Sequence, residues 1–207
     1  MTLRIEKATM DVAVRYRRLS AFAYWVSQIG SPPLTGAAAV LLVSSALATN
    51  GAWGWAGFYL LATILLPCLY IVWLVRTGHV SDFHLPIREE RIRPLIFSLA
   101  TALAAWGILY QGAAPAPLRM LAGVNGVQAL IFFLITLRWK VSLHTAAAAV
   151  MAQLALTFLG TSALPLTVSV PLIAWSRVHL RRHTVAQTIG GACLGVAILT
   201  PALFWYI

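Results

Sequence analysis

The sequence predicts an all-α fold, a polytopic transmembrane helical bundle. Of its 207 residues, 60% are hydrophobic and 10% are charged, whereas roughly a quarter of the residues in a soluble domain are charged. The mean hydropathy is +0.84, and a soluble fold of this length cannot hide so much apolar surface, so the bilayer must be its solvent. Apolar stretches near the roughly 20 residues of a membrane span recur along the chain. We therefore expect about six to seven spans plus an N-terminal interfacial helix.

The N-terminal part of the chain differs from the rest because it is basic and only partly apolar. No short apolar core with a small-residue cleavage site follows the basic cluster, so we expect no cleaved signal peptide. Residues 21–30 contain three aromatic side chains and precede Pro32 and Pro33, where a helix ends or restarts. Such an aromatic stretch is typical of a helix that lies in the membrane interface. We therefore divide the chain into a basic N-terminus with an interfacial helix, 1–33, and a single transmembrane bundle, 34–207.

Seven apolar segments of the bundle are candidates for membrane spans. They cover residues 34–49, 54–76, 95–112, 118–137, 144–160, 163–176 and 185–207. The sixth segment is short and contains Pro165 and Pro171, but prolines are tolerated where neighbouring helices satisfy the freed carbonyls. Gly191 and Gly195 in the last segment have the spacing that allows close helix approach. The sequence shows no internal repeat, which favours one compact bundle.

The charged residues predict the sidedness of this bundle. Seven alternating spans place the N-terminus and the loops 77–94, 138–143 and 177–184 on one side, and only Arg119 among the basic residues adjoins the other side. By the positive-inside rule the polar face is cytoplasmic, in an inner membrane of the bacterial type. The net charge of +10 lies between apolar segments. This placement favours membrane lipids and anionic head groups as partners, and no nucleic acid, because no interleaved basic and aromatic surface is present.

Each of the three polar loops brings a cationic side chain and a histidine to the same membrane face. A phosphate monoester needs fixed cations for its oxygens, a nucleophile, and an acid for the departing alkoxide. Arginine offers a bidentate fork for the oxygens, and histidine can serve as nucleophile or proton donor near neutral pH. Single basic residues at helix ends usually anchor helices and set topology. The convergence of three such loops nevertheless favours a site for a phosphate.

The three loops carry motifs in a characteristic order, Arg-Pro, then Ser-x-His, then Ser-Arg followed after five residues by His. This order resembles the three signatures of the type-2 phosphatidic acid phosphatase superfamily. The matching residues are Arg93, Pro94, Ser142, His144, Ser176, Arg177 and His183. Residues 80–195 also resemble a divergent membrane branch of that superfamily, in which an acidic and arginine-rich run, a Lys-x-Ser-x-His loop and a His-Thr-x-x-Gln-x-x-Gly-Gly segment occur together.

The resemblance implies a metal-independent lipid phosphatase that needs no cofactor. It assigns His183 as the nucleophile that forms a phosphohistidine and His144 as the acid that protonates the leaving oxygen. It also implies that Arg177 and Arg93 clamp the phosphate. The remaining residues that we expect to bind substrate are Lys140, Arg88, Ser142 and Arg182. The implied substrate is a lipid or polyprenyl phosphate or diphosphate, and a homo-oligomer is left open.

Two positions depart from the family pattern. Pro86 occupies the slot of a lysine, and we infer that Lys140 or Arg88 supplies the missing cation. Gln187 stands where the family has an acid behind the nucleophile, and loss of such an acid can cost on the order of 10⁴ in rate. A glutamine can still accept a hydrogen bond from the ring, so we expect Gln187 to orient His183.

These departures leave functions of different classes open. The leading hypothesis is a membrane phosphohydrolase, and the alternative is a non-catalytic lipid-phosphate-binding or scaffold subunit that has lost turnover. A transporter is a third hypothesis, but neither an inverted repeat nor a pair of interrupted helices supports it. A metal site built from Asp82, His84, Glu89 and Glu90 is also conceivable. The arginines between these acids favour ion pairs that hold the loop instead, so we expect no metal.

Overall fold

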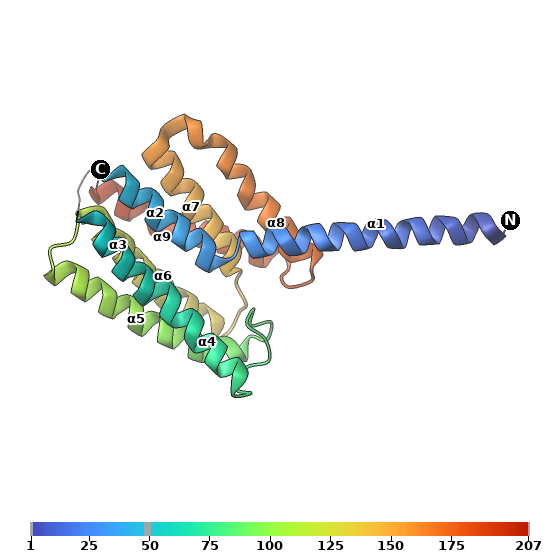
Figure 1. Cartoon of the computed structure of the whole chain (residues 1–207), viewed down its shortest axis with the longest axis horizontal. Coiled ribbons are helices and arrows are strands. Elements are labelled where there is room, and N and C mark those ends of the chain that lie inside the picture. The colour runs from blue at the N-terminus through green and yellow to red at the C-terminus, as the bar shows by residue number, and fades with distance from the viewer. Residues whose placement is uncertain (1, 48–50, 207) are drawn as a thin grey trace.

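The computed structural model describes the backbone of residues 2–47 and 51–206 and the side chains of residues 15–47 and 51–206. Within these ranges the chain forms helices and turns and no strand, which confirms the predicted all-α class (Figure 1). The elements are α1 (Thr2–Ile29), α2 (Pro32–Ala46), α3 (Ala52–Leu60), η1 (Leu61–Leu65), α4 (Leu66–Arg76), η2 (Glu89–Arg91), α5 (Ile92–Gln111), α6 (Ala116–Thr136), α7 (Leu143–Leu159), η3 (Gly160–Val168), α8 (Ser169–His179) and α9 (Val185–Tyr206).

Several of these helices can cross a membrane, as the hydropathy predicted. Five helical stretches in the described chain are long and apolar enough, and α1 from Arg15 together with α2 makes a sixth that is bent by 45°. One of the five, the 37-residue stretch Leu143–His179, folds back so that α7 and α8 lie side by side (Figure 1). The reversal begins at Gly160, whose φ of 66° favours glycine.

The second predicted span is one helix with an irregular centre. The stretch α3–η1–α4 runs from Ala52 to Arg76, and η1 is a single π-helical segment directly before Pro67. Proline has no backbone N–H and its ring clashes with the carbonyl four residues earlier, so a wider turn at this point accommodates it. The sequence predicted the span but not this irregular segment.

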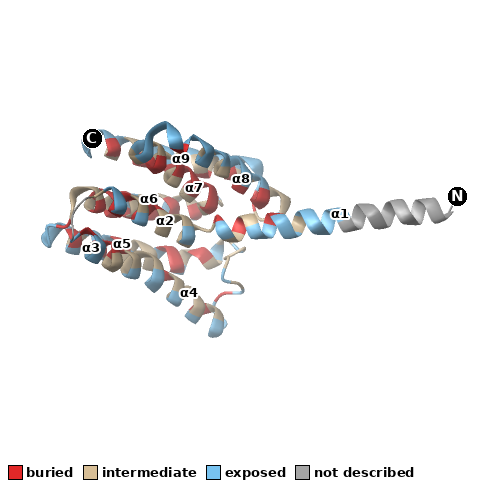
Figure 2. Ribbon diagram, turned by 45° about the horizontal axis from the view of Figure 1, so that its top comes forward, coloured by how far each residue is buried: buried red, intermediate tan, exposed pale blue. Residues whose placement is uncertain are grey.

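Small residues bring the helices of the bundle close together, and larger apolar side chains fill the rest of the core. Figure 2 marks the buried residues along these helices. Helix α9 packs on α7 through Gly191 and Gly195, as their spacing predicted. A Cβ at Gly195 would lie 2.7 Å from the carbonyl oxygen of Ala146, and a Cβ at Gly191 would collide with the carbonyl oxygen of Ser142. Close backbone approach through glycine is typical of helix packing in membranes.

Helix α1 extends away from the bundle, and the C-terminal half of the helix contacts α8 (Figure 1). There Ala23 and Ser27 are buried against α8, and the Phe22 ring lies 5.9 Å from that of Trp175. The stretch predicted as an interfacial helix is thus the end of a 28-residue helix. Its position in the membrane interface and the domain boundary at residue 33 stay predictions.

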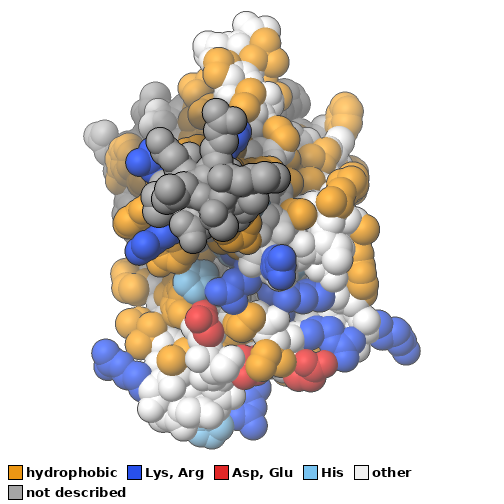
Figure 3. Space-filling model, turned by 90° about the vertical axis from the view of Figure 1, so that its right-hand side faces the viewer, with side chains coloured by type: hydrophobic (Ala, Val, Ile, Leu, Met, Phe, Trp, Pro, Cys, Tyr) orange, Lys and Arg blue, Asp and Glu red, His pale blue; other side chains and the backbone are white. Residues whose placement is uncertain are grey.

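The three polar loops and the junction between α1 and α2 gather at the end of the bundle from which α1 projects. Figure 3 looks onto this end and shows Lys and Arg side chains spread over it, with acidic and histidine side chains among them. The alternation of the helices places the loops there, as the sequence predicted. This end of the molecule therefore positions the candidate site.

Candidate functional site

A cavity of about 550 Å³ lies between α2, the π-helical stretch η1 with α4, α6 and α7, and it reaches the polar loops. Its walls are mostly apolar, and no carboxylate lines it among the described side chains. Towards the polar end the lining includes four basic side chains, His84, Arg91, His144 and His183. The cavity therefore combines a basic region with an apolar remainder.

His183 lies in the loop between α8 and α9, where Gln187 fixes its ring. Its Nδ1 lies 3.1 Å from Oε1 of Gln187, and the backbone N–H of Thr184 donates to the same oxygen at 3.2 Å. Because a backbone N–H can only donate, Oε1 is an acceptor, so Nδ1 of His183 carries the proton. The Nε2 atom then keeps its lone pair, and this atom is buried without a hydrogen-bond partner. Gln187 thus takes the orienting position that the sequence predicted.

The same glutamine also caps the start of α9. The hydroxyl of Thr184 accepts from the backbone N–H of Gln187 at 3.3 Å. Together with the reverse contact this forms a capping box, which satisfies two of the free N–H groups at a helix start. The spacing from Thr184 to Gln187 is typical of such a cap, so this second use of Gln187 could also have been predicted from the sequence.

The surroundings of His183 keep its ring uncharged near neutral pH. Burial first, and then the positive charges of Arg91, Arg177 and Lys140, lower the pKa of His183 to about 3, although the hydrogen bond to Gln187 opposes this. The side chain is 6% exposed. A neutral imidazole with a free Nε2 has the protonation state that a nucleophile needs.

His144 is the second residue of α7 and lines the same cavity as His183. The hydroxyl of Ser142 caps α7 by accepting from the N–H of Thr145, and the N–H of Ser142 donates to the carbonyl of Gln187 at 3.1 Å. The Thr145 hydroxyl donates to the carbonyl of Thr188 at 2.8 Å. These bonds join the starts of α7 and α9 and bring the two histidines together, and Nε2 of His144 is also buried without a partner.

The position of Ser142 differs from its predicted role. Its side chain is fully buried as a helix cap and is not part of the cavity lining. The hydroxyl is already engaged with α7, so it supports the position of His144 without facing the cavity. The serine of the second motif therefore has a structural use here.

Two arginines are buried beside the histidines without an anionic partner. Arg91 is 5% exposed and donates to the carbonyls of Leu85 at 2.9 Å and Val141 at 3.2 Å. Arg177 is 3% exposed and donates to the hydroxyl of Ser27 at 2.7 Å, while its Nε has no partner. The ion pairs among the described side chains involve neither arginine. A buried cation is costly unless an anion compensates it, so this arrangement is suited to an anionic ligand.

Arg177 and Lys140 lie beside the cavity and are not part of its lining. Their positive charges contribute to the low pKa of His183. The ammonium of Lys140 donates to the carbonyl of Pro86 at 2.8 Å, so a cation lies next to Pro86. Burial first, and then the charges of Arg91, Arg177 and Arg182, lower the pKa of Lys140 to about 8.

Like Ser142 and Lys140, the other three predicted substrate-binding residues lie outside the cavity lining. Arg93 is exposed on α5. Arg88 pairs with Glu89 at 2.9 Å and donates to the carbonyl of Leu137 at 3.3 Å. Arg182 is partly exposed, and its charge reaches Lys140. Arg91, the last residue of η2, lines the cavity, whereas Arg93 in the first turn of α5 does not.

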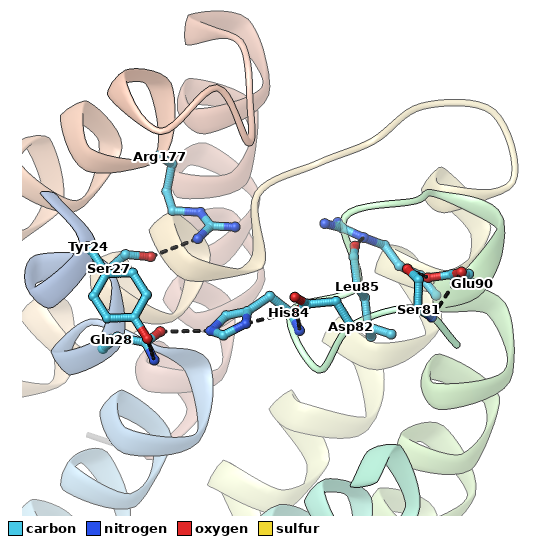
Figure 4. Close-up of polar contacts among 10 residues, drawn as sticks. Tyr24, Ser27, Gln28, Ser81, Asp82, His84, Leu85, Glu90 and Arg177 are labelled. Carbon is cyan, nitrogen blue, oxygen red and sulfur yellow. Dashed lines mark hydrogen bonds and ion pairs between the residues drawn. The ribbon is translucent and has the colours of Figure 1, made fainter. Parts of the chain in front are cut away.

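Helix α1 contributes two contacts to the site that the sequence did not predict (Figure 4). Ser27 holds Arg177, and the amide oxygen of Gln28 lies 2.7 Å from Nε2 of His84. Nδ1 of His84 in turn lies 3.0 Å from Oδ1 of Asp82. Nothing in the sequence links Ser27 and Gln28 to loops far along the chain, because only the packing of α1 brings them there.

The acids that were considered as a metal site do not converge. Asp82 contacts His84, Glu89 pairs with Arg88, and Glu90 accepts from the backbone and hydroxyl of Ser81 at 3.1 Å and 2.8 Å. In the described part of the chain no group of three or more His, Cys, Asp or Glu side chains is arranged to hold a metal ion. These acids therefore stabilise the loop between α4 and α5.

The fold and the site together define an integral membrane protein, an α-helical bundle with a basic, histidine-lined cavity at one end. In comparisons with known proteins, the chain matches no protein-family model, no curated protein and no solved structure. The resemblance to the type-2 phosphatidic acid phosphatase superfamily therefore stays a hypothesis that rests on the motifs of the three loops.

Proposed function

We propose that the protein is a membrane phosphohydrolase that removes phosphate from a lipid or polyprenyl phosphate or diphosphate. The observation that carries this proposal is the pair of buried guanidinium groups, Arg91 and Arg177, beside a neutral His183 with a free Nε2. No carboxylate pairs with either arginine among the described side chains. A phosphate group supplies about two negative charges and several acceptor oxygens, which is what two such arginines lack.

In the proposed reaction, Nε2 of His183 attacks the phosphorus as the bond from phosphorus to the lipid oxygen breaks. A phosphohistidine forms, and the leaving oxygen takes up a proton; the family resemblance assigns this proton transfer to His144. Water then attacks the phosphohistidine, the bond from phosphorus to nitrogen breaks, and inorganic phosphate leaves. Arg91, Arg177 and Lys140 stabilise the charge on the phosphate oxygens throughout.

The apolar part of the cavity supports a lipid over a small soluble phosphate. Beyond the histidines the lining includes Ile64, Leu121 and Phe132, contributed by η1 and α6. An apolar chain that fills this space removes apolar surface from water, which is favourable by about 25 cal/mol per Å². A phosphate carried on a long apolar chain therefore suits both parts of the cavity.

The test is phosphate release by the detergent-solubilised protein in EDTA, with phosphatidic acid, a polyprenyl phosphate and a polyprenyl diphosphate as substrates. Wild-type protein should release phosphate from at least one of them. The His183→Ala variant should release none, because the covalent intermediate cannot form. His79 is exposed in the loop after α4 and outside the cavity lining, so His79→Ala is the matched control and should retain activity.

The presence of Gln187, at the position where the family has an acid, favours a second candidate, a non-catalytic protein that binds lipid phosphates. A glutamine orients His183 but supplies no negative charge to stabilise its imidazolium form. This alternative expects no histidine-dependent phosphate release, while binding of the lipid phosphate persists and weakens in Arg177→Ala. A wild type that releases phosphate, with equal release by His183→Ala, would contradict both candidates.

We also propose that the polar end faces the cytoplasm, in an inner membrane of the bacterial type, because the basic side chains gather there. The test uses single cysteines at Thr77 and Arg181, both exposed at this end, after the native Cys68 and Cys193 are replaced by alanine. Both sites should react with an impermeant thiol reagent from the cytoplasmic side only. Reaction of both from outside would refute the orientation, and reaction from opposite sides would contradict the placement of the loops at one end.

A further inference from the structure

A third histidine, His84, lines the same cavity as His144 and His183. It lies in the loop between α4 and α5, and the family motifs do not include it. Oδ1 of Asp82 lies 3.0 Å from its Nδ1 and accepts from its backbone N–H at 2.6 Å. Among the described histidines of the cavity, His84 alone has a carboxylate against its ring.

The three histidines differ in the group that faces the ring. A carboxylate behind an imidazole stabilises the protonated ring, whereas an amide oxygen only orients it. His183 has the amide of Gln187 behind it, and Nε2 of His144 has no partner. The backbone N–H of His84 first, and then its ring and the charge of Arg182, lower the pKa of Asp82 despite its partial burial, so this acid is ionised near neutral pH.

The other side of the His84 ring faces an acceptor. Nε2 of His84 lies 2.7 Å from Oε1 of Gln28, whose amide nitrogen donates to the hydroxyl of Tyr24 at 3.2 Å (Figure 4). With the amide nitrogen directed at Tyr24, Oε1 accepts the Nε2–H proton of His84. Gln28 lines the cavity as well. The proton on Nε2 is therefore presented where a ligand oxygen in the cavity can replace Gln28 as its acceptor.

We propose that His84, backed by Asp82 and held by Gln28, is the acid that protonates the leaving oxygen, in place of His144. This inference rests on the proposed phosphohydrolase function. As the bond from His183 Nε2 to phosphorus forms and the bond from phosphorus to the lipid oxygen breaks, the Nε2 proton of His84 passes to that oxygen. The product is a neutral alcohol, and His84 remains as a neutral ring hydrogen-bonded to Asp82.

In the second half of the reaction, the neutral His84 takes a proton from the attacking water. The bond from phosphorus to nitrogen breaks, inorganic phosphate leaves, and His84 is again protonated beside Asp82. In this assignment the carboxylate that the third motif lacks is present in the first loop. It acts on the proton donor and not on the nucleophile.

The test compares two substrates whose leaving oxygens differ in basicity. The leaving group of phosphatidic acid is an alkoxide, which needs a proton. The leaving group of p-nitrophenyl phosphate is a stable phenolate, which does not. The quantity compared is kcat/KM, which reports the steps up to release of the leaving group and not the hydrolysis of the phosphohistidine that both substrates share. In His84→Asn, kcat/KM for phosphatidic acid should fall by about a hundredfold or more, as expected for loss of general acid catalysis, while kcat/KM for the aryl phosphate changes by less than about threefold. Asp82→Asn, which can keep the bond to the backbone of His84, should show the same selectivity to a smaller extent. His79→Asn is the control and should affect neither substrate.

Other outcomes would separate the failure of this inference from the failure of the proposed function. Equal losses of kcat/KM on both substrates in His84→Asn and Asp82→Asn, or an unchanged kcat/KM for phosphatidic acid, would overturn the role of His84 as the acid. Selective loss in His144→Asn instead would assign the acid to His144. If the wild type releases phosphate from neither substrate, the phosphohydrolase proposal itself is wrong. If the wild type hydrolyses both, only the role of His84 is at stake.

Discussion

Replacing Gln187 with glutamate should make the proposed phosphohydrolase faster. The two side chains have the same length, so the glutamate can keep the contacts of Oε1 with Nδ1 of His183 at 3.1 Å and with the N–H of Thr184 at 3.2 Å. The substitution adds a negative charge behind the ring, which stabilises the imidazolium that develops when His183 is phosphorylated.

The size of the effect follows from the geometry. Two opposite unit charges about 4 Å apart attract each other by about 4 kcal/mol at an effective dielectric constant of about 20. Gln187 is half-buried, and water screens part of this interaction, so we expect about half, or about 2 kcal/mol. This corresponds to about 30-fold in kcat and to about 1.5 pH units in the pKa of His183, which should rise from about 3 to between about 4 and 5.

The assay is steady-state phosphate release between pH 4 and pH 7.5. A raised pKa of His183 means that the ring becomes protonated, and loses its free Nε2, at a higher pH. The ratio of kcat/KM between variant and wild type should therefore decline as pH falls from 6 to 4, and substrate ionisation cancels in this ratio. Ala186 is exposed on the neighbouring position, so Ala186→Glu adds the same charge as a control and should raise neither kcat nor the pKa. A Gln187→Glu variant with tenfold lower kcat and a constant ratio across this range would refute the reasoning.

Three further predictions concern the cation, the contact from α1, and the helix packing. Because the pKa of Lys140 is lowered to about 8, its side chain loses its charge as pH rises through 8, so KM should increase there. The Lys140→Arg variant should not show this increase in KM. An increase in the variant like that of the wild type would contradict the role of Lys140. Ser27→Ala removes the hydroxyl that lies 2.7 Å from the guanidinium of Arg177. Since hydrogen bonds to charged groups contribute about 1.5–3 kcal/mol, KM should rise about tenfold or more. An unchanged KM would show that this bond is dispensable. Gly195→Ala places a Cβ 2.7 Å from a carbonyl oxygen of α7 and should destabilise the bundle by about 1–3 kcal/mol, seen as a lower Tm in detergent, whereas Gly54→Ala, with nothing within 4 Å, should not lower it.

The fold could be predicted from the sequence because membrane spans are a property of length and hydropathy. The structure confirms the all-α bundle, and α7 and α8 lie side by side where two separate spans were expected. The irregular segment η1 could not be predicted as readily. A proline in an apolar stretch can kink, end or widen a helix, and the neighbouring helices decide which of these occurs.

The candidate site was predicted in part. Alternation of the spans places the loops at one end, so His144 and His183 line one cavity as expected, and Gln187 contacts His183 because the two belong to the same helix start. The motif predicted Arg93 as the arginine that binds the phosphate, whereas Arg91 is the one that lines the cavity. A motif names neighbouring arginines but does not fix the rotation of a helix about its axis, which depends on what each face packs against.

The sequence by itself thus determined that this is an integral membrane protein, which segments are long and apolar enough to cross a membrane, and which loops share one end of the bundle, because these depend on hydropathy and on the order of segments along the chain. Only the tertiary structure decided that Arg91 and Arg177 are buried without a carboxylate among the described side chains, and that α1 supplies Ser27 to Arg177. Ser27 and Arg177 are 150 residues apart in sequence. No local pattern encodes such a contact, because it depends on how α1 packs against α8 and on the 45° bend between α1 and α2.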